Sequence, residues 1–274
     1  MELVNFTISL YMSTRNDGGL RLVITQPMLM PWHGLFSQIL LADRVLIYDD
    51  VQLPTGGGSG RSFMTRVQIK TPNGVDWLSI PVQRSGYSNQ RICDAKVCNT
   101  SWRKQHLAKI ERSYSKAPFF QEILSNVVLP IYQNESSYLA DFLIQSMKVI
   151  GGVLGVKTSF ERSSLGDWAN ELSGTERLVK ICRRLGASDY LSGNGGMNYL
   201  DYESFERNKI RVKHFSYRLR PYQQLHHGFT PYLSTIDLLF CVGPQFARDY
   251  LETIPIYWRD WPHNLDGRPV PFSP

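Results

Sequence analysis

The chain has 274 residues, of which 42% are hydrophobic and 12% aromatic, enough for a core without disulfide or metal staples. Its four cysteines are scattered and form no Cys-x-x-Cys pair, which favours a reducing compartment. No apolar stretch reaches the roughly 20 residues of a membrane span. We therefore expect a cytoplasmic protein with no membrane partner. The net charge of +6 favours anionic partners such as nucleotides, nucleotide-activated sugars and RNA.

The first predicted elements alternate between strand and helix. Residues 20–25 are short and apolar and run into a Gln-Pro pair at 26–27, where a strand should end. Apolar residues recur at helical spacing over 32–42, and residues 44–48 then form a buried strand that ends in two aspartates. This βαβ-type opening predicts an α/β fold with a parallel or mixed central sheet and flanking helices.

The middle of the chain mixes turn, strand and helix signals. The glycine-rich residues 55–60 predict a mobile loop. Two strands, at 63–70 and 77–82, are expected to form a hairpin around the Thr-Pro-Asn-Gly turn at 71–74. The next stretch is mostly helical and predicts a helical insertion at about 102–150.

The remaining elements follow from periodicity and turn residues. We expect helices at 175–185, 233–240 and 246–251, and strands at 189–191 and 211–216. The proline-rich end gives little sign of regular structure. The predicted organisation is an N-terminal extension at 1–20, one α/β domain at 21–257 and a C-terminal tail at 258–274.

The most informative stretch for chemistry is 26–52. A strand, a proline turn and a helix N-terminus there can turn backbone N–H groups toward an anion, and carboxylates end the next strand, where α/β ligands bind. The candidate bases are His33, Asp49 and Asp50. The candidate substrate-binding residues are Gln26, Trp32 and Gln52. A tight turn that only packs would contain the same residue types.

A second group lies on the first strand of the expected hairpin. Arg66, Gln68 and Lys70 alternate with apolar residues and therefore share one strand face. Two cations and an amide there can clamp a phosphate or carboxylate, and arginine is the better bidentate partner. An ordinary solvated strand face would look the same. Arg66 and Lys70 are the candidates for substrate binding.

A glycine-rich turn follows the strand expected at 189–191. Ser192, Gly193, Asn194 and Gly195 allow close approach of a ligand to the backbone, and Tyr199 follows shortly after. The spacing matches neither a Rossmann fingerprint nor a P-loop. Substrate binding and a plain turn both remain open for this segment.

Two further candidates lie near the C-terminal end. Gln223 and Asp237 are polar positions in an apolar, aromatic stretch. Asp237 is either a buried carboxylate with a perturbed pKa or a helix cap, and capping suits Ser234 as well. His226 and His227 are adjacent and point apart, so they do not form a shared metal site. We expect no metal and no cofactor.

The motifs carry a family resemblance when they are taken in chain order. They are Gln26-Pro27 with Pro31-Trp32-x-Gly34, Asp49-Asp50-Val51-Gln52, Arg66 with Ile69-Lys70 and Trp77-Leu78, Tyr190-Leu191-Ser192-Gly193, and Ser234-x-x-Asp237-Leu238-Leu239 with Gly243-Pro244. This ordered set resembles the WbqC-like family over residues 22–244. The resemblance implies a bacterial protein of polysaccharide or natural-product biosynthesis that transfers a glycyl group onto an amino sugar.

The leading hypothesis is therefore a transferase that moves a glycyl or aminoacyl group onto an amine acceptor, such as a nucleotide-activated amino sugar. An aminoacyl-tRNA is the candidate donor partner. An ATP-dependent, adenylate-forming amide ligase is the first alternative, although Leu35 stands where the second histidine of a His-x-Gly-His signature would be, after His33 and Gly34. A non-catalytic small-molecule or RNA-binding module is the second.

Overall fold

The computed structural model describes residues 19–54, 62–83, 89–99, 101–217, 219–251, 253–264 and 269. The glycine-rich loop expected at 55–60, nearly all of the N-terminal extension and most of the C-terminal tail lie outside these residues. Within the described residues, no helix combines the length and the apolar character needed to cross a membrane.

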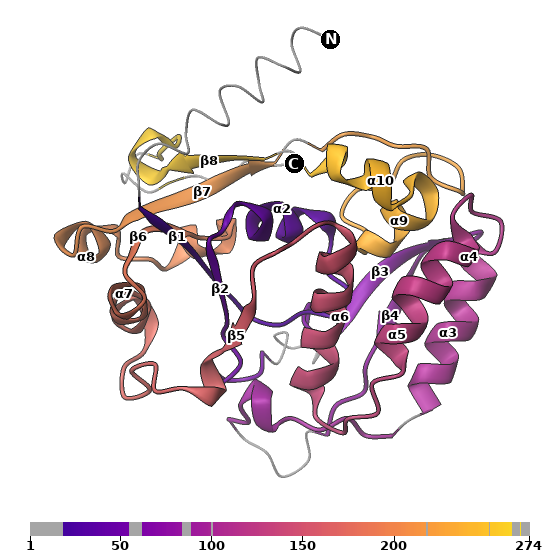
Figure 1. The fold of residues 1–274 in the computed structure, drawn as a ribbon, viewed down its shortest axis with the longest axis horizontal. Helices are drawn as coiled ribbons and strands as arrows, with labels where there is room; N and C mark the ends of the chain where they lie inside the picture. The colour runs from indigo at the N-terminus through magenta and orange to yellow at the C-terminus, as the bar shows by residue number, and fades with distance from the viewer. Residues whose placement is uncertain are drawn as a thin grey trace, which may run out of the picture.

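The described residues form a six-stranded sheet in the order β5-β2-β1-β6-β7-β8 (Figure 1). The strands are β1 (Leu20–Thr25), β2 (Arg44–Ile47), β5 (Phe160–Arg162), β6 (Ala187–Leu191), β7 (Arg211–Tyr217) and β8 (Thr253–Tyr257). The first five are parallel, and β8 pairs antiparallel with β7. The sheet is therefore mixed and lies among flanking helices, which confirms the predicted α/β fold.

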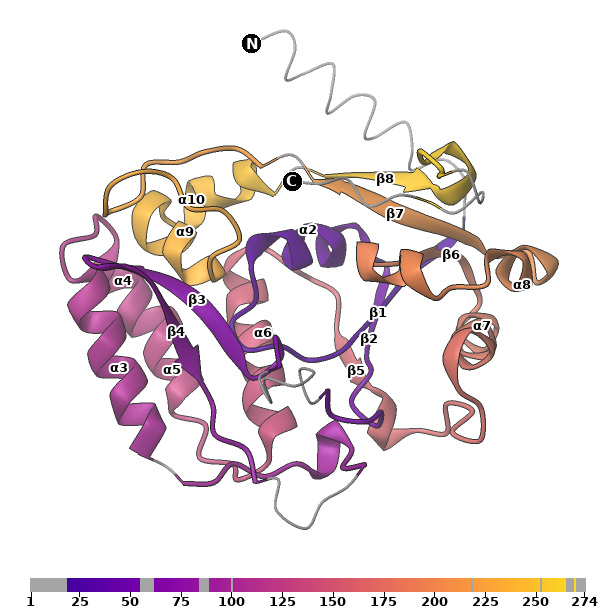
Figure 2. The ribbon, with the colours of Figure 1, turned by 180° about the vertical axis from the view of Figure 1, so that it is seen from behind.

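Helices cover both faces of the sheet because neighbouring strand residues point to opposite sides. In β1, Val23 joins the core that includes α2 (His33–Leu41) and α6 (Leu139–Val153), while Leu22 joins the core that includes α7 (Gly174–Arg184) and α8 (Tyr202–Arg207). Figures 1 and 2 show α7 and α8 on one side of the sheet and α2 and α6 on the other. The sheet is thus the middle of three layers.

The strand order reverses direction beside β1. The chain passes from β1 through α2 to β2 on one side, and the later strands β6 and β7 add on the other side. Neighbouring crossovers that leave in opposite directions open a crevice at the carboxyl ends of the two central strands. The fold therefore places a ligand site after Thr25 and after Leu191.

A hairpin and several helices extend the core beyond the sheet. The hairpin pairs β3 (Arg66–Thr71) with β4 (Gly74–Ser79) and packs against α3 (Ser101–Tyr114). The remaining helices are α4 (Phe120–Ile123), α5 (Leu129–Tyr132), α9 (Thr235–Val242) and α10 (Pro244–Ala247), with a π-helical turn at Leu124–Val128. Helices thus occupy most of the segment from α3 to α6.

Some elements differ from their predicted positions. The second hairpin strand was expected at 77–82 but begins at Gly74, because this glycine takes a φ of 104° and already pairs with Thr71. Strand β8 was missed because Pro255 interrupts its pattern, yet proline is tolerated at a sheet edge. The nearby Trp261 is only 1% exposed, so this part of the expected tail packs onto the domain.

Candidate functional site

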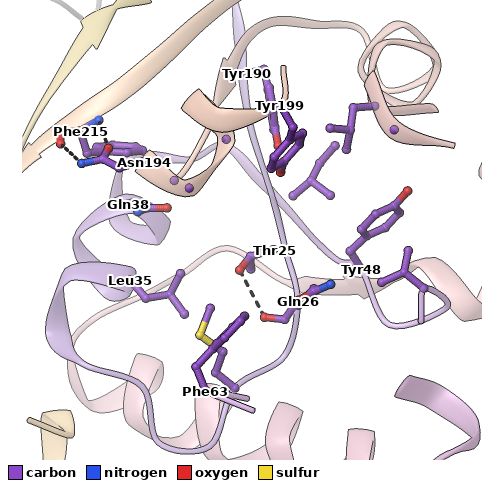
Figure 3. Close-up of a pocket in the computed structure, with 18 of the residues that line it drawn as sticks. Thr25, Gln26, Leu35, Gln38, Tyr48, Phe63, Tyr190, Asn194, Tyr199 and Phe215 are labelled. Atoms are coloured by element: carbon purple, nitrogen blue, oxygen red, sulfur yellow. Dashed lines mark hydrogen bonds between the residues drawn. The ribbon is translucent and has the colours of Figure 1, made fainter. Parts of the chain in front are cut away.

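A cavity of about 1170 Å³ lies at the carboxyl ends of β1, β2, β6 and β7 (Figure 3). Gln26 follows β1, Tyr48 follows β2, Gly193 follows β6, and Ser216 lies near the end of β7. This is the switch point of the strand order, where open α/β sheets bind ligands. The volume is slightly above the usual range of about 300–1,000 Å³ for small-molecule sites, so a nucleotide-sized ligand fits.

The described part of the lining is aromatic and rich in amide groups. Its polar groups include those of Gln26, Gln38, Gln52, Ser173, Asn194 and Ser216. Its aromatic residues include Trp32, Tyr48, Phe63, Tyr199, Tyr217 and Tyr232. Among the described lining residues, Arg177 is the one charged side chain. Such a surface suits a ligand with flat rings and many hydroxyl or amide groups.

The charge of Arg177 is already balanced by Asp50. Its guanidinium donates to the Asp50 carboxylate at 2.6 Å, and both side chains are buried. It also donates to Asn170 and lies 4.8 Å above the ring of Tyr48. Burial is the main cause that raises the pKa of the Tyr48 phenol, and the neighbouring Arg177 opposes it. Arg177 and Asp50 therefore form a neutral pair that shapes one wall.

Asp49 is not part of the described cavity lining. Its carboxylate accepts hydrogen bonds from Arg162, from the Ser163 hydroxyl, and from both the backbone and the hydroxyl of Ser164. The side chain is fully buried, and Arg162 also pairs with Asp141. This set of donors uses the lone pairs that a general base would need. The geometry gives Asp49 the role of tying β2 to β5 and α6.

Three aromatic rings form another wall. Trp32 packs edge to face against Tyr217 at 4.9 Å and against Tyr232 at 5.2 Å. The backbone of Tyr232 takes a φ of 59°, a conformation that residues other than glycine rarely adopt and that the surrounding structure must hold in place. The surrounding packing therefore holds the Tyr232 ring at the cavity against a local conformational preference.

The proline turn after β1 is fixed by the start of α9. The Ser234 hydroxyl donates to the Met30 carbonyl at 2.7 Å, and Thr235 donates to the Pro31 carbonyl through both its hydroxyl and its backbone N–H. Ser234 also accepts from the backbone of Ile236, so it caps α9 as expected. Segments from opposite ends of the chain thus hold Trp32 in place.

The glycine-rich turn after β6 is held by the Asn194 side chain, which bonds to the backbone of β7 as a neighbouring strand would. Asn194 donates to the Phe215 carbonyl at 3.1 Å and accepts from the Phe215 N–H at 3.2 Å. A Cβ atom on Gly196 would overlap the Ser192 hydroxyl, so the turn has no room there for a side chain. Gly193 and Gly195 line the cavity, whereas Ser192 does not.

The predicted site residues divide into those that line the cavity and those that do not. Gln26, Trp32, Gln52, Asn194 and Tyr199 line the cavity. The residues outside the described lining are His33, Asp49, Asp50, Arg66, Lys70, Ser192, Gln223 and Asp237. Asp50 contacts the lining through its ion-pair partner Arg177.

His33 is buried at the start of α2 beside Trp32. Burial lowers the pKa of its imidazole to about 4, so the ring is neutral near pH 7. A neutral imidazole can accept a proton, but His33 lies outside the cavity lining. The fold therefore favours a packing role for this ring.

The residues predicted to clamp an anion lie apart from one another. The Arg66 guanidinium stacks over the Trp77 ring at 4.1 Å. Lys70 is buried, and its ammonium donates to the Gln224 side chain at 2.8 Å and to the Gly228 carbonyl. The charged groups of Arg66 and Lys70 are therefore both engaged by other residues of the protein.

Lys70 belongs to a polar cluster around Asp237. The Asp237 carboxylate accepts from the Tyr222 hydroxyl at 2.7 Å and from the Tyr114 hydroxyl at 2.8 Å. The backbone N–H of Lys70 donates to the Tyr114 oxygen. Burial raises the pKa of Asp237 above its ordinary value. Gln223 is exposed on the adjoining segment. This cluster joins the hairpin to α9 outside the cavity.

Sequence reasoning missed several lining residues. Gln38 and Arg177 stand on helix faces that are otherwise apolar, and this interruption of the apolar periodicity was the available signal. Tyr217 follows the strand expected at 211–216, and Tyr232 lies just before Ser234 of the family motifs, but neither residue gave a signal of its own. Their role depends on contacts between parts of the chain that are far apart in the sequence.

The model of the WbqC-like protein family matches residues 26–249. The chain belongs to the WbqC-like protein family. It is also 36% identical over 236 residues to the uncharacterized protein Rv1507c of Mycobacterium tuberculosis, an alignment that covers 85% of this chain and 97% of that protein. No solved structure matches the chain.

The region matched by the WbqC-like model contains nearly the whole cavity. Of the described lining residues, only Ile24 and Thr25 precede the match. The proline turn, the glycine-rich turn, α2 and α7 all fall inside it. The segments that build the cavity are therefore also segments of the family region.

Proposed function

We propose that this chain is a transferase that moves a glycyl or related aminoacyl group onto the amine of a nucleotide-activated amino sugar. The observation that carries the proposal is the large cavity at the strand switch point, whose described lining contains aromatic rings, side-chain amides and a single charged side chain. Aromatic rings stack on nucleobases and on sugar rings, and amides bind hydroxyl groups and base edges without adding charge. A nucleotide-linked sugar offers all of these partners.

The reaction is aminolysis of an activated aminoacyl ester. The amine nitrogen attacks the ester carbonyl, a C–N bond forms, the C–O bond to the ribose oxygen breaks, and a proton from the amine goes to that oxygen. The ester supplies the activation, so the step requires orientation and a site for the oxyanion more than a strong base. An aminoacyl-tRNA is the proposed donor, and the chain's net charge of +6 favours its approach.

The lining supports a transferase better than an adenylate-forming ligase. A ligase must hold the triphosphate of ATP, and phosphate sites are rich in arginine, lysine or free backbone N–H groups. In the described lining the single guanidinium is already paired with Asp50. The diphosphate of a nucleotide sugar meets the same lack of unpaired cations, so the preference for a transferase rests on its smaller phosphate charge and on the rings and hydroxyl groups that the lining can bind.

The direct test supplies a UDP- or dTDP-linked amino sugar together with radiolabelled glycyl-tRNA. We expect label in the nucleotide sugar without ATP, and none after ribonuclease treatment or when a hydroxyl replaces the sugar amine. Label from free glycine and ATP, but not from glycyl-tRNA, would establish the ligase instead. Nucleotide-sugar binding without transfer from either donor would leave a binding module.

A further inference from the structure

Gln38 and Tyr217 form a hydrogen-bonded pair at the cavity. Gln38 lies on α2 and is 6% exposed, and its amide N–H donates to the Tyr217 hydroxyl at the end of β7. The Tyr217 ring packs against Trp32 at 4.9 Å and against Phe215 at 5.9 Å. Both side chains line the cavity. The bond between them and the packing of the Tyr217 ring therefore position both polar groups at the cavity wall.

The bond between them leaves one acceptor and one donor unused. The Gln38 carbonyl oxygen has no hydrogen-bond partner among the described residues, and Figure 3 shows it turned toward the cavity. Tyr217 accepts the amide N–H through its oxygen, so its own hydrogen remains available, and no described residue accepts it. An acceptor beside a donor at the cavity wall suits a ligand that presents the complementary pair.

The described residues that surround the pair in the lining are uncharged. Trp32, Leu35 and Phe215 are its neighbours in the lining, and the only charged group of the described lining, Arg177, is paired with Asp50. Burial raises the pKa of the Tyr217 phenol, which keeps it protonated and able to donate. An amine that enters this neutral wall loses water, which favours its uncharged, nucleophilic form.

We infer that Gln38 and Tyr217 hold the two reacting groups of the transfer. The Gln38 carbonyl oxygen accepts an N–H of the acceptor amine, and the Tyr217 hydroxyl donates to the carbonyl oxygen of the aminoacyl ester. As the C–N bond forms, negative charge grows on that oxygen and Tyr217 stabilises it; the ester C–O bond then breaks, and the amine proton goes to the departing ribose oxygen. This inference rests on the proposed transferase function and assigns its catalytic residues.

The pair suits the tetrahedral intermediate better than the product. In the intermediate the N–H and the oxyanion can lie on the same side of the new C–N bond, so one acceptor and one donor bind both. In the trans amide product the N–H and the carbonyl point in opposite directions. The pair therefore releases the product more readily than it holds the intermediate, as catalysis requires.

The first test measures binding. Calorimetry compares UDP- and dTDP-linked amino sugars with deoxy counterparts that carry a hydrogen in place of the amine and so have no donor there. We expect Gln38→Met to lose the wild-type preference for the amine while its affinity for the deoxy counterpart stays the same. An unchanged preference in this variant would overturn the role of Gln38.

The second test measures transfer from glycyl-tRNA. Tyr217→Phe removes only the hydroxyl, and we expect the rate to fall about 10²-fold, the typical effect of losing one oxyanion donor, with little change in sugar affinity. Tyr138→Phe is the control, because Tyr138 is exposed and lies outside the cavity lining. A Tyr217→Phe variant that binds and transfers like the wild type would refute the role of Tyr217.

A charge variant separates catalysis from packing. Gln38→Glu places a carboxylate beside the amine, which should hold it as ammonium and move the pH–rate profile upward, with activity recovering at alkaline pH. An unshifted profile in this folded variant would contradict the inference. Failure of the wild type to bind or label any amino sugar would instead reject the proposed function itself.

Discussion

The indole ring of Trp32 lies over the backbone of Gly34, so that a Cβ atom at position 34 would overlap the ring. The same ring packs against Tyr217 and Tyr232 in the aromatic wall of the cavity. The glycine in the second position of α2 is therefore required by a side chain two residues earlier. This contact links a sequence feature of the proline turn directly to the shape of the cavity.

Replacing Gly34 by alanine should displace the Trp32 ring. We expect the variant to lose about 1–3 kcal/mol of stability, as in other overpacked cores, and to bind a nucleotide sugar about tenfold more weakly. Urea unfolding and calorimetry measure the two effects. Gly152→Ala is the matched control, since a Cβ atom there meets nothing within 4 Å on helix α6 and should be neutral or slightly stabilising.

Asp49 should contribute to stability more than to turnover. Its carboxylate is fully buried and accepts from Arg162, Ser163 and Ser164, so Asp49→Ala leaves the serine donors without their acceptor, while Arg162 keeps its pair with Asp141. We expect a loss of about 1–3 kcal/mol in the free energy of unfolding. Urea denaturation measures this loss.

A surface ion pair provides the control for Asp49. Asp94 pairs with Arg91 at 2.6 Å, but both side chains are about half exposed, so Asp94→Ala should cost less than about 1 kcal/mol. If Asp49→Ala were as stable as the wild type yet inactive, Asp49 would act in the reaction rather than in the fold.

Three buried histidines predict acid sensitivity. Burial lowers the pKa of His33, His106 and His214 from the usual 6.5 to about 4. The unfolded state therefore takes up these protons at a higher pH than the folded state, so their stabilising effect is complete above pH 6.5 and declines toward pH 4.

The expected slope is up to about 1.4 kcal/mol per pH unit for each histidine within this window. Urea unfolding between about pH 7.5 and about pH 5 tests it, because that interval spans the ordinary titration of histidine. His106→Gln should reduce the slope by about a third. A flat profile would mean that the folded rings protonate at their ordinary pH.

Alanine substitution should reduce stability far less at Arg66 than at Arg177. Arg66 stacks on Trp77 away from the cavity, so Arg66→Ala should lose less than about 1 kcal/mol and keep its affinity for a nucleotide sugar. Arg177→Ala leaves Asp50 buried and unpaired and should cost about 3–5 kcal/mol. Thermal unfolding and calorimetry compare the two. Weakened nucleotide-sugar binding in a stable Arg66→Ala variant would show that Arg66 takes part in substrate binding.

The opening of the fold was predictable because its signals are local. Residues 20–48 carry strand, helix and strand periodicities one after another, and these fix a βαβ unit. Strand β5 has three residues and β8 contains Pro255, so neither carries a periodic signal. The position of β6 beside β1 depends on packing across most of the chain, which no local pattern encodes.

The site was most directly predictable where a residue follows the carboxyl end of a strand. Gln26 and Gly193 lie at the cavity because each follows a central strand at its carboxyl end. Asp49 also follows a strand, yet its side chain turns to Arg162, and sequence position alone cannot distinguish these outcomes. Gln38 is a polar residue on a buried helix, and its use became clear only with Tyr217 beside it.

The pairing of β1 with β6 has a consequence for synthesis on the ribosome. The hairpin β3–β4 and the helices from α3 to α6 are formed from local segments and can fold as they emerge, but β1 must wait for β6 before its second edge is covered. The cavity closes still later, because Tyr217 and Tyr232 follow β6 in the chain. A nascent chain that ends before these residues has no binding site, so the ligand can stabilise only a nearly finished molecule.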